Sequence, residues 1–309
     1  MLSRIAESLF WIGRYIERAD DTARLLDVHL QILLEDPWAE EDLACRSLLS
    51  VMDRRLSEAD VTVGRDQVVQ MLAYDRAEPS AIAGSLVAAR ENARRAREVI
   101  STELWEALNI TWTQLPWFLE LDRPHVFFTW TRERAAVISG IVDSTISRDE
   151  TWQFLVLGRS LERADMTARL LTTRALTGTA GPDWRTLLGS CGAHEAYLRR
   201  YRGVASDESA AGFLLTDRVF PRSVVHALGQ AEACLHALDP LRDQQGVDEA
   251  RMRIGRARTS LEFRRLADVL EELPQQMERV QRSCSAASDA IRSRYFPSGG
   301  VTTWIGGVR

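Results

Sequence analysis

Residues 13–26 read GRYIERADDTARLL, and residues 158–171 read GRSLERADMTARLL. The two stretches lie 145 positions apart and share 11 identities in 14 positions. Further matches at offsets of 142 and 146 are Leu72/Leu214, Asp75/Asp217, Arg76/Arg218, Pro79/Pro221 and Trp38/Trp184. Solenoid repeats have periods of about 20 to 50 residues, and this longer period therefore indicates a duplicated unit of domain size.

The repeat predicts two halves, residues 1–145 and 146–309, that form one compact unit. By analogy with symmetric dimers, the halves should pack about a pseudo-two-fold axis, with equivalent surfaces facing each other. Residues 297–309 read PSGGVTTWIGGVR, and their four glycines predict a flexible or docking arm that carries Trp304.

Apolar residues around the first motif recur at steps of three and four, namely Ile12, Ile16, Ala19, Ala23, Leu26, Leu30 and Leu33. This spacing is typical of an amphipathic helix, and strand patterns are nearly absent from the chain. We therefore predict an all-α fold, a duplicated helical bundle with helices at 3–35, 39–58, 64–74, 80–108, 131–146, 149–178, 183–203, 221–238, 247–270 and 274–295. The segment 111–130, with two prolines among aromatic residues, is expected to be irregular.

Composition narrows the class of protein. The 309 residues are 45% hydrophobic, enough for a core, and the net charge of −5 argues against nucleic acid as a partner. No apolar run approaches the roughly 20 residues that span a bilayer, and no signal peptide begins the chain. The four cysteines form no C-x-x-C pair, which favours a reducing compartment. We expect a cytoplasmic protein that has no membrane partner.

All 39 basic residues are arginine, because the chain contains no lysine. Schiff-base chemistry and a lysine-containing phosphate loop are thereby excluded, and no G-x-G-x-x-G string is present. We expect no cofactor. A nucleotide used in this protein's pathway would be bound by a partner.

The repeated motif places a polar strip beside the apolar stripe. At about 100° per residue, Gly13, Glu17, Asp20 and Arg24 share one side of a helix. Their counterparts are Gly158, Glu162, Asp165 and Arg169. A glycine inside a helix costs about 1 kcal/mol relative to alanine and is usually kept where something must approach closely.

Two interpretations of the strip remain open. In the first it is an ion-pair network within each helix, with Asp20 and Arg24 at i,i+4, Glu17 and Arg24 at i,i+7, and Arg14 and Glu17 at i,i+3. The two copies would then interlock across the axis. In the second, Glu17, Asp20, Glu162 and Asp165 converge in a polar site. Di-iron proteins also use inward carboxylates, but no Glu-x-x-His is present and an arginine shares each strip, which disfavours a metal.

The two halves differ in one charged segment. Residues 89–109 are crowded with polar groups, whereas the matching stretch near 231–239 is bland. These groups either form a one-sided cleft or lie on a solvated helix with paired charges. The candidate cleft residues are Arg90, Glu91, Asn92, Arg94 and Glu98, of which positions 91, 94 and 98 should share one face of the helix. Aromatic residues between Trp105 and Trp130 are either core or a partner-binding patch.

Four strings together resemble the Alpha-E family, bacterial helical proteins named for a conserved E-R motif. They are MLSRIAESLFWIGRYIERADDTARLLDV, LERADMTARLL, DRAEPSAIAGSL and ARENARRAREVISTELWEALN. The motif falls on Glu17-Arg18 and Glu162-Arg163. Arg14 and Arg18, with the counterparts Arg159 and Arg163, lie on an adjoining polar face and could pair with another helix or hold a carboxylate or phosphate. Because neighbours on a helix point about 100° apart, Glu17 and Arg18 should not serve one face.

The resemblance also implies a setting. Genes of this family adjoin those of circularly permuted ATP-grasp ligases, transglutaminase-like proteins and an NTN-hydrolase-type peptidase, which implies a peptide synthesis or modification system. We expect a binding or scaffolding component that partners the ligase, with a peptide or amino acid as a further candidate ligand. The alternatives are an enzyme of that pathway, acting through the carboxylates and arginines of both motifs, and a carboxylate metal protein.

Overall fold

The computed structural model describes residues 1–35, 41–54, 62–120, 123–177, 183–202, 206–238 and 248–297. Within these ranges the chain is helical and contains no strand, which confirms the predicted all-α class. Trp38 and residues 298–309 of the predicted arm, including Trp304, lie outside the described residues.

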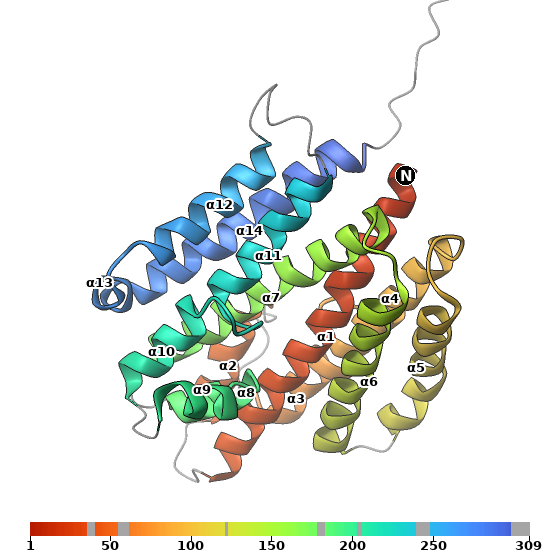
Figure 1. Cartoon of the computed structure of the whole chain (residues 1–309). Helices are drawn as coiled ribbons and strands as arrows, with labels where there is room; N and C mark the ends of the chain where they lie inside the picture. The colour runs from red at the N-terminus through yellow and green to blue at the C-terminus, as the bar shows by residue number, and fades with distance from the viewer. Residues whose placement is uncertain are drawn as a thin grey trace, which may run out of the picture.

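Two long helices cross at the centre of the molecule. They are α1 (Ser3–Glu35) and α7 (Glu150–Thr177), each of which carries one copy of the repeated motif. Figure 1 shows α1 and α7 between two groups of helices. One group packs around α1 and comprises α4 (Ile82–Arg95), α5 (Thr102–Glu120) and α6 (Pro124–Thr145). The other packs around α7 and comprises α11 (Val224–Leu238), α12 (Glu249–Glu262) and α14 (Leu273–Tyr295).

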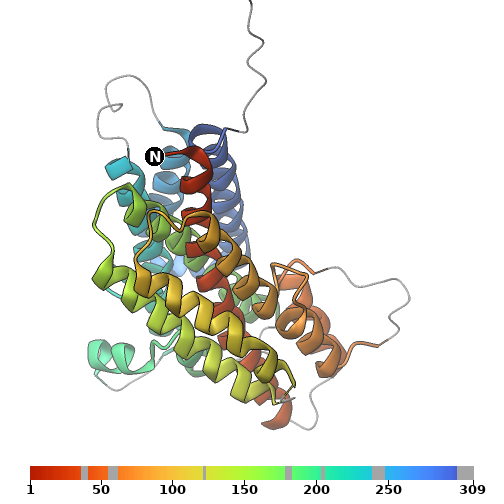
Figure 2. The ribbon, with the colours of Figure 1, turned by 90° about the vertical axis from the view of Figure 1, so that its right-hand side faces the viewer.

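Shorter helices complete the bundle. Those in the first half are α2 (Glu41–Val51), α3 (Arg65–Val69) and the π-helix η1 (Gln70–Tyr74). Those in the second half are α8 (Trp184–Ser190), α9 (His194–Tyr201), α10 (Asp207–Thr216) and α13 (Leu266–Glu271). The helix after α1, α2, packs against α7, and the helix after α7, α8, packs against α1. Each long helix therefore contacts the segment that follows the other one. Figure 2 shows the bundle from the side, with α14 (blue) beside the N-terminal part of α1 (red).

The crossing depends on the two motif glycines. A Cβ atom on Gly13 would lie 2.0 Å from the carbonyl oxygen of Leu155, and one on Gly158 would lie 2.0 Å from that of Phe10. Since real Cβ atoms do not approach backbone this closely, any larger residue would force α1 and α7 apart. The predicted close approach at these glycines is confirmed, and the contacts are reciprocal, as a duplicated unit with a pseudo-two-fold axis would require. The duplication and the division at residue 145 stay predictions.

The predicted apolar stripe of α1 lies in the core. Ile12, Ala19, Ala23 and Leu26 are at most 1% exposed, and Leu30 packs against them from the edge. This burial leaves the charged strip of α1 facing α7 rather than solvent, because both stripes are on the inner half of the helix. The site described below therefore lies inside the bundle.

Several predicted helix boundaries are wrong. The predicted helix 80–108 is two helices, since α4 ends at Arg95 and the Ser101 hydroxyl accepts the amide proton of Leu104 at the start of α5. The predicted helices 183–203 and 247–270 are likewise divided, and α10 was not predicted. Ser206 begins α10 through a capping box with Ser209. Two serines three positions apart indicate the start of a helix only weakly in the sequence.

The segment 111–130 is helical, contrary to the prediction. Helix α5 runs through Pro116, although a proline inside a helix typically costs about 3 kcal/mol. Aromatic packing stabilises the helix against this cost, because Phe118 stacks on Trp130 of α6 with ring centroids 4.3 Å apart. Part of the aromatic cluster thus belongs to the core.

No helix in the described ranges combines the length and apolarity that crossing a bilayer requires. The four cysteines are buried and unbridged.

Candidate functional site

The two E-R motifs bind each other across the crossing of α1 and α7. Arg18 donates from Nε and Nη2 to the Glu162 carboxylate at 2.6 and 3.1 Å. Arg163 donates in the same way to Glu17 at 2.5 and 2.8 Å. Both carboxylates are 1 to 2% exposed. Each motif therefore supplies the acid for the arginine of the other copy, in a paired fork geometry that arginine and carboxylate favour.

Glutamate and arginine of one motif thus serve one network, although Glu17 and Arg18, as predicted, do not share one face of the helix. Their side chains do leave the helix in different directions. The partner helix α7 crosses closely enough to reach both, because the motif glycines allow backbone contact at that point. The glycines and the salt bridges therefore act together to hold α1 against α7.

Each glutamate also contacts a second arginine, and here the two sides differ. Glu162 accepts from Arg14 Nε at 2.5 Å, and the same guanidinium reaches the Ser288 hydroxyl of α14 at 2.7 Å. Glu17 pairs instead with Arg222 Nη1 at 3.0 Å. Arg159, the counterpart of Arg14, lies 3.3 Å from Asp143 on α6. The expected local pair between Arg14 and Glu17 is not the contact that the structure shows.

The aspartates of the strips pair within their own helices, as the i,i+4 spacing predicts. Asp20 accepts from Arg24 Nε at 3.0 Å, and Asp165 accepts from Arg169 Nε at 2.8 Å. Arg169 also donates to the carbonyl of Val51, at the end of α2, at 2.6 Å. These pairs extend the network from the crossing point to the neighbouring short helix.

Sequence reasoning missed Arg222, which contacts Glu17, Asp20 and Asp21 together. Arg222 follows Pro221 in the turn before α11. A signal was present: where the first copy has Asp21 the second has Met166, and where the second half has Arg222 the first has Ser80. Asp21, which has no acidic counterpart in the second half, binds Arg222, which has no basic counterpart in the first half.

The electrostatics of the buried glutamates are dominated by these arginines. Burial alone would raise the pKa of Glu17, but Arg163 and Arg222 outweigh it and lower the pKa to about 2. Burial likewise opposes ionisation of Glu162, and Arg14 with Arg18 lowers its pKa to about 2. Both groups are therefore carboxylates throughout the physiological pH range.

Asp21 behaves differently. Burial raises the pKa of Asp21 to about 8, with Arg222 opposing and the nearby Glu17 and Asp20 carboxylates adding to the rise. One of its carboxylate oxygens, Oδ2, is buried without a hydrogen-bond partner among the described residues. Asp21 is thus the carboxylate of this cluster that accepts a proton most readily.

Oxygens of Glu17, Asp20 and Asp21 come within 4.8 Å of one another, a spacing at which three carboxylates could hold a metal ion. The cation between them is the Arg222 guanidinium, which already contacts all three. A divalent ion would have to displace it. The donor set therefore fits an arginine, and metal binding receives no further support from the geometry.

The candidate cleft residues of the asymmetric segment lie on and just beyond α4. Glu91 joins Arg90 at 2.5 Å and Arg94 at 3.1 Å, and Asn92 donates to the carbonyl of Ala88 in its own helix. Because α4 ends at Arg95, Glu98 does not continue the face that Glu91 and Arg94 share. The predicted shared face is therefore wrong for Glu98.

Comparisons with known proteins agree with this geometry. The sequence model of the Alpha-E family, described as a predicted alpha-helical domain with a conserved ER motif, matches residues 1–296. Uncharacterized protein Mb2597 of Mycobacterium bovis and uncharacterized protein Rv2567 of Mycobacterium tuberculosis are each 26% identical over 291 residues. The aligned region is 82% of this chain and 32% of each relative, and the chain thus spans about a third of their length. No solved structure gives a significant match.

Proposed function

The chain belongs to the Alpha-E family, and we propose that it is a non-catalytic binding and scaffolding component of a bacterial peptide synthesis or modification system. In this proposal it works in the cytoplasm and docks with a circularly permuted ATP-grasp ligase, with a transglutaminase-like protein as a further partner. The E-R motif holds the two long helices together, and the exposed helices recognise the partner.

The observation that carries the proposal is the saturation of both motif glutamates. Each is buried and each contacts two arginines, with a pKa near 2. A general acid or base needs a pKa near the working pH and must reach the substrate. Glu17 and Glu162 meet neither condition. The motif therefore favours an architectural role over the alternative of acid/base or acyl-transfer chemistry.

The lengths of the relatives also support a role beside another protein. In the mycobacterial proteins the aligned region is about a third of the chain, and the same kind of domain is thus covalently joined to further polypeptide. A domain that occurs within a longer chain can act together with the polypeptide to which it is joined. We propose that the present chain likewise acts together with another protein component.

The proposed docking face is the outer side of α4 and α5, which we call the α4–α5 face and define by Arg90, Arg97, Trp105, Trp112 and Trp117. The Arg90 guanidinium lies 5.4 Å from the ring of Trp105 and 4.8 Å from that of Trp112, and Arg97 lies 5.6 Å from Trp105. Trp117 is 58% exposed. Tryptophan and arginine dominate interface hot spots, and rings already held by cations lose little freedom on binding.

The test is a calorimetric titration with the ATP-grasp ligase encoded nearby. Replacing both Arg94 and Arg97 by Glu, or removing residues 297–309, should weaken binding at least tenfold, about 1.4 kcal/mol. Both arginines are exposed, and the thermal stability of the double variant should therefore change little. A matched control reverses Arg265, just before α13, and Arg282 on α14, whose side chains are 86% and 70% exposed.

Four results would count against the proposal. Unchanged affinity in both variants would place docking elsewhere, and equal loss in the control would show a general charge effect. No complex between the full chain and the ligase would remove the proposed partner itself. Turnover of a peptide substrate by the isolated chain would favour the enzyme alternative.

A further inference from the structure

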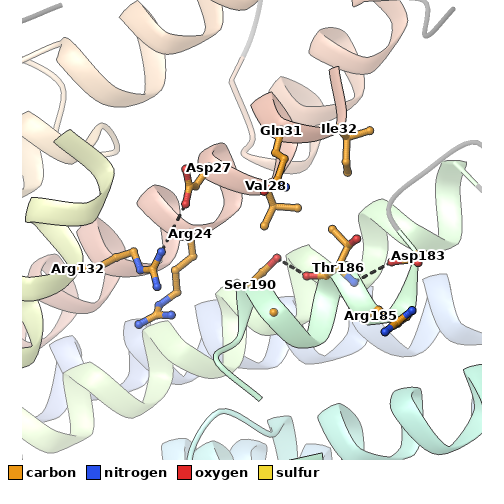
Figure 3. Close-up of a pocket in the computed structure, with 11 residues that line it drawn as sticks. Arg24, Asp27, Val28, Gln31, Ile32, Arg132, Asp183, Arg185, Thr186 and Ser190 are labelled. Atoms are coloured by element: carbon orange, nitrogen blue, oxygen red, sulfur yellow. Dashed lines mark hydrogen bonds and ion pairs between the residues drawn. The ribbon is translucent and has the colours of Figure 1, made fainter. Parts of the chain in front are cut away.

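A cavity of about 470 Å³ lies between the second half of α1, α6 and α8, and Arg24 of the first motif lines its wall. Small-molecule sites commonly have volumes of about 300 to 1,000 Å³. Three arginines line it, one from each element, together with hydroxyl groups of α8 (Figure 3). These residues are Arg24, Arg132, Arg185, Thr186 and Ser190.

The carboxylates of this cavity already have partners. Asp27 lies 2.6 Å from His125 Nδ1 and 3.4 Å from Arg132 Nη1. Asp183 accepts the amide proton of Thr186 at 2.7 Å and caps α8. Neither acid therefore uses up the donors of the arginines, since a guanidinium has five N–H groups. The cavity offers more donors than acceptors.

Arg132 is the residue of this cavity whose hydrogen bonding is least complete. Its Nε is buried and has no hydrogen-bond partner among the described residues, while its one ion pair, with Asp27, is long at 3.4 Å. A buried donor left unpaired typically costs about 1 to 3 kcal/mol, more when charged. An acceptor bound in the cavity would relieve that cost. Figure 3 shows Arg24 and Arg132 at one end of the cavity and Arg185 at the other.

A second cavity of about 640 Å³ adjoins the first, because Asp27 and Gln31 line both. Its walls are more apolar and include Leu30, Leu34 and Phe128. A ligand with one charged end and one apolar end would match the two neighbouring environments.

We propose that these cavities bind a small organic anion, with a carboxylate or phosphate held by Arg132 and Arg24 and an apolar portion directed toward Leu30 and Phe128. The site lies on α1, α6 and α8, whereas the proposed docking face lies on α4 and α5. It therefore goes beyond the proposed function and does not depend on a ligase.

The test uses the full chain labelled with ¹⁵N in its arginine side chains and follows the Nε–H signals by NMR. Hexanoate is the probe, hexanamide its uncharged match, and inorganic phosphate the second anion. Hexanoate should bind at least about tenfold more tightly than hexanamide and should shift the Arg132 signal. Phosphate binding stronger than hexanoate binding would identify a phosphate as the anion, and the reverse a carboxylate.

Arg132→Gln and Arg24→Gln should each weaken binding of the preferred anion about fivefold or more. Arg24 also pairs with Asp20, and Arg132→Gln remains informative if Arg24→Gln disturbs the fold. Arg282→Gln on α14 is the control and should bind like wild type. The inference is overturned if acid and amide bind equally, if both cavity variants retain wild-type affinity, or if neither anion binds at concentrations up to about 10 mM.

Discussion

Glu17 on α1 accepts two hydrogen bonds from Arg163 on α7, at 2.5 and 2.8 Å, although the residues are 146 positions apart. Glu162 and Arg18 form the matching pair. A buried carboxylate that loses its charge leaves an arginine unpaired in a medium of low dielectric constant. The stability of the whole bundle is therefore expected to depend on these four side chains.

The first prediction concerns Glu17 and Glu162. Replacing either glutamate by Ala should lower the free energy of unfolding by about 3 to 5 kcal/mol, because two arginines each lose a buried carboxylate partner. Gln should cost less, since it keeps the acceptor oxygen. Chemical denaturation measures the change, and Glu91→Ala on the surface of α4 is the control. Alanine variants that melt like wild type would rule out the architectural role.

A second prediction concerns the motif glycines. Gly13→Ala and Gly158→Ala each place a methyl group 2.0 Å from a backbone oxygen of the other helix, and the helices must separate. We expect losses at or above the upper end of the ~1–3 kcal/mol that overpacking usually costs. Gly140→Ala on α6 is the matched control: nothing lies within 4 Å of its Cβ position, and the variant should gain up to about 1 kcal/mol. Similar melting of all three variants would contradict the crossing geometry.

Acid should destabilise the protein through the same glutamates. Their pKa falls from 4.5 to about 2 on folding, and between these values the folded state binds fewer protons than the unfolded state. Stability is therefore full above pH 4.5 and is lost as pH falls toward 2, by roughly 3 kcal/mol for each glutamate. The free energy of unfolding, measured by chemical denaturation at several pH values in this range, should change less with pH for Glu162→Gln than for wild type. An equal change with pH in both proteins would show that other groups control acid unfolding.

Asp21 should produce the opposite trend at higher pH. Its pKa rises from 3.8 to about 8 on folding, and between these values the folded state binds more protons than the unfolded state. Its contribution to stability therefore declines as pH rises from about 4 to 8. Asp21→Asn keeps an acceptor for Arg222 and removes the titration, and the variant should be less sensitive to pH across this window. A difference between wild type and variant that is constant with pH would contradict the raised pKa.

Local periodicity was sufficient for the two helices that carry the motif. The predicted helix 3–35 coincides with α1, and the predicted helix 149–178 differs from α7 by one residue at each end. Their apolar stripes repeat over many turns, and propensity, pattern and burial all favour the same structure. Shorter helices were joined or missed, because breaks such as the one before α5 depend on a single capping side chain, that of Ser101.

The sequence by itself determined that this is an all-helical protein with two copies of the E-R motif, since helical periods and identities are local properties of the chain. It also indicated that something approaches Gly13 closely. Only the tertiary structure decided which arginine meets which glutamate. The i,i+3 rule favoured Arg14 with Glu17, whereas Arg14 binds Glu162 and the turn residue Arg222 takes the place beside Glu17. The physical reason is that a guanidinium binds the carboxylate that packing brings to it, and packing joins residues that are distant in sequence.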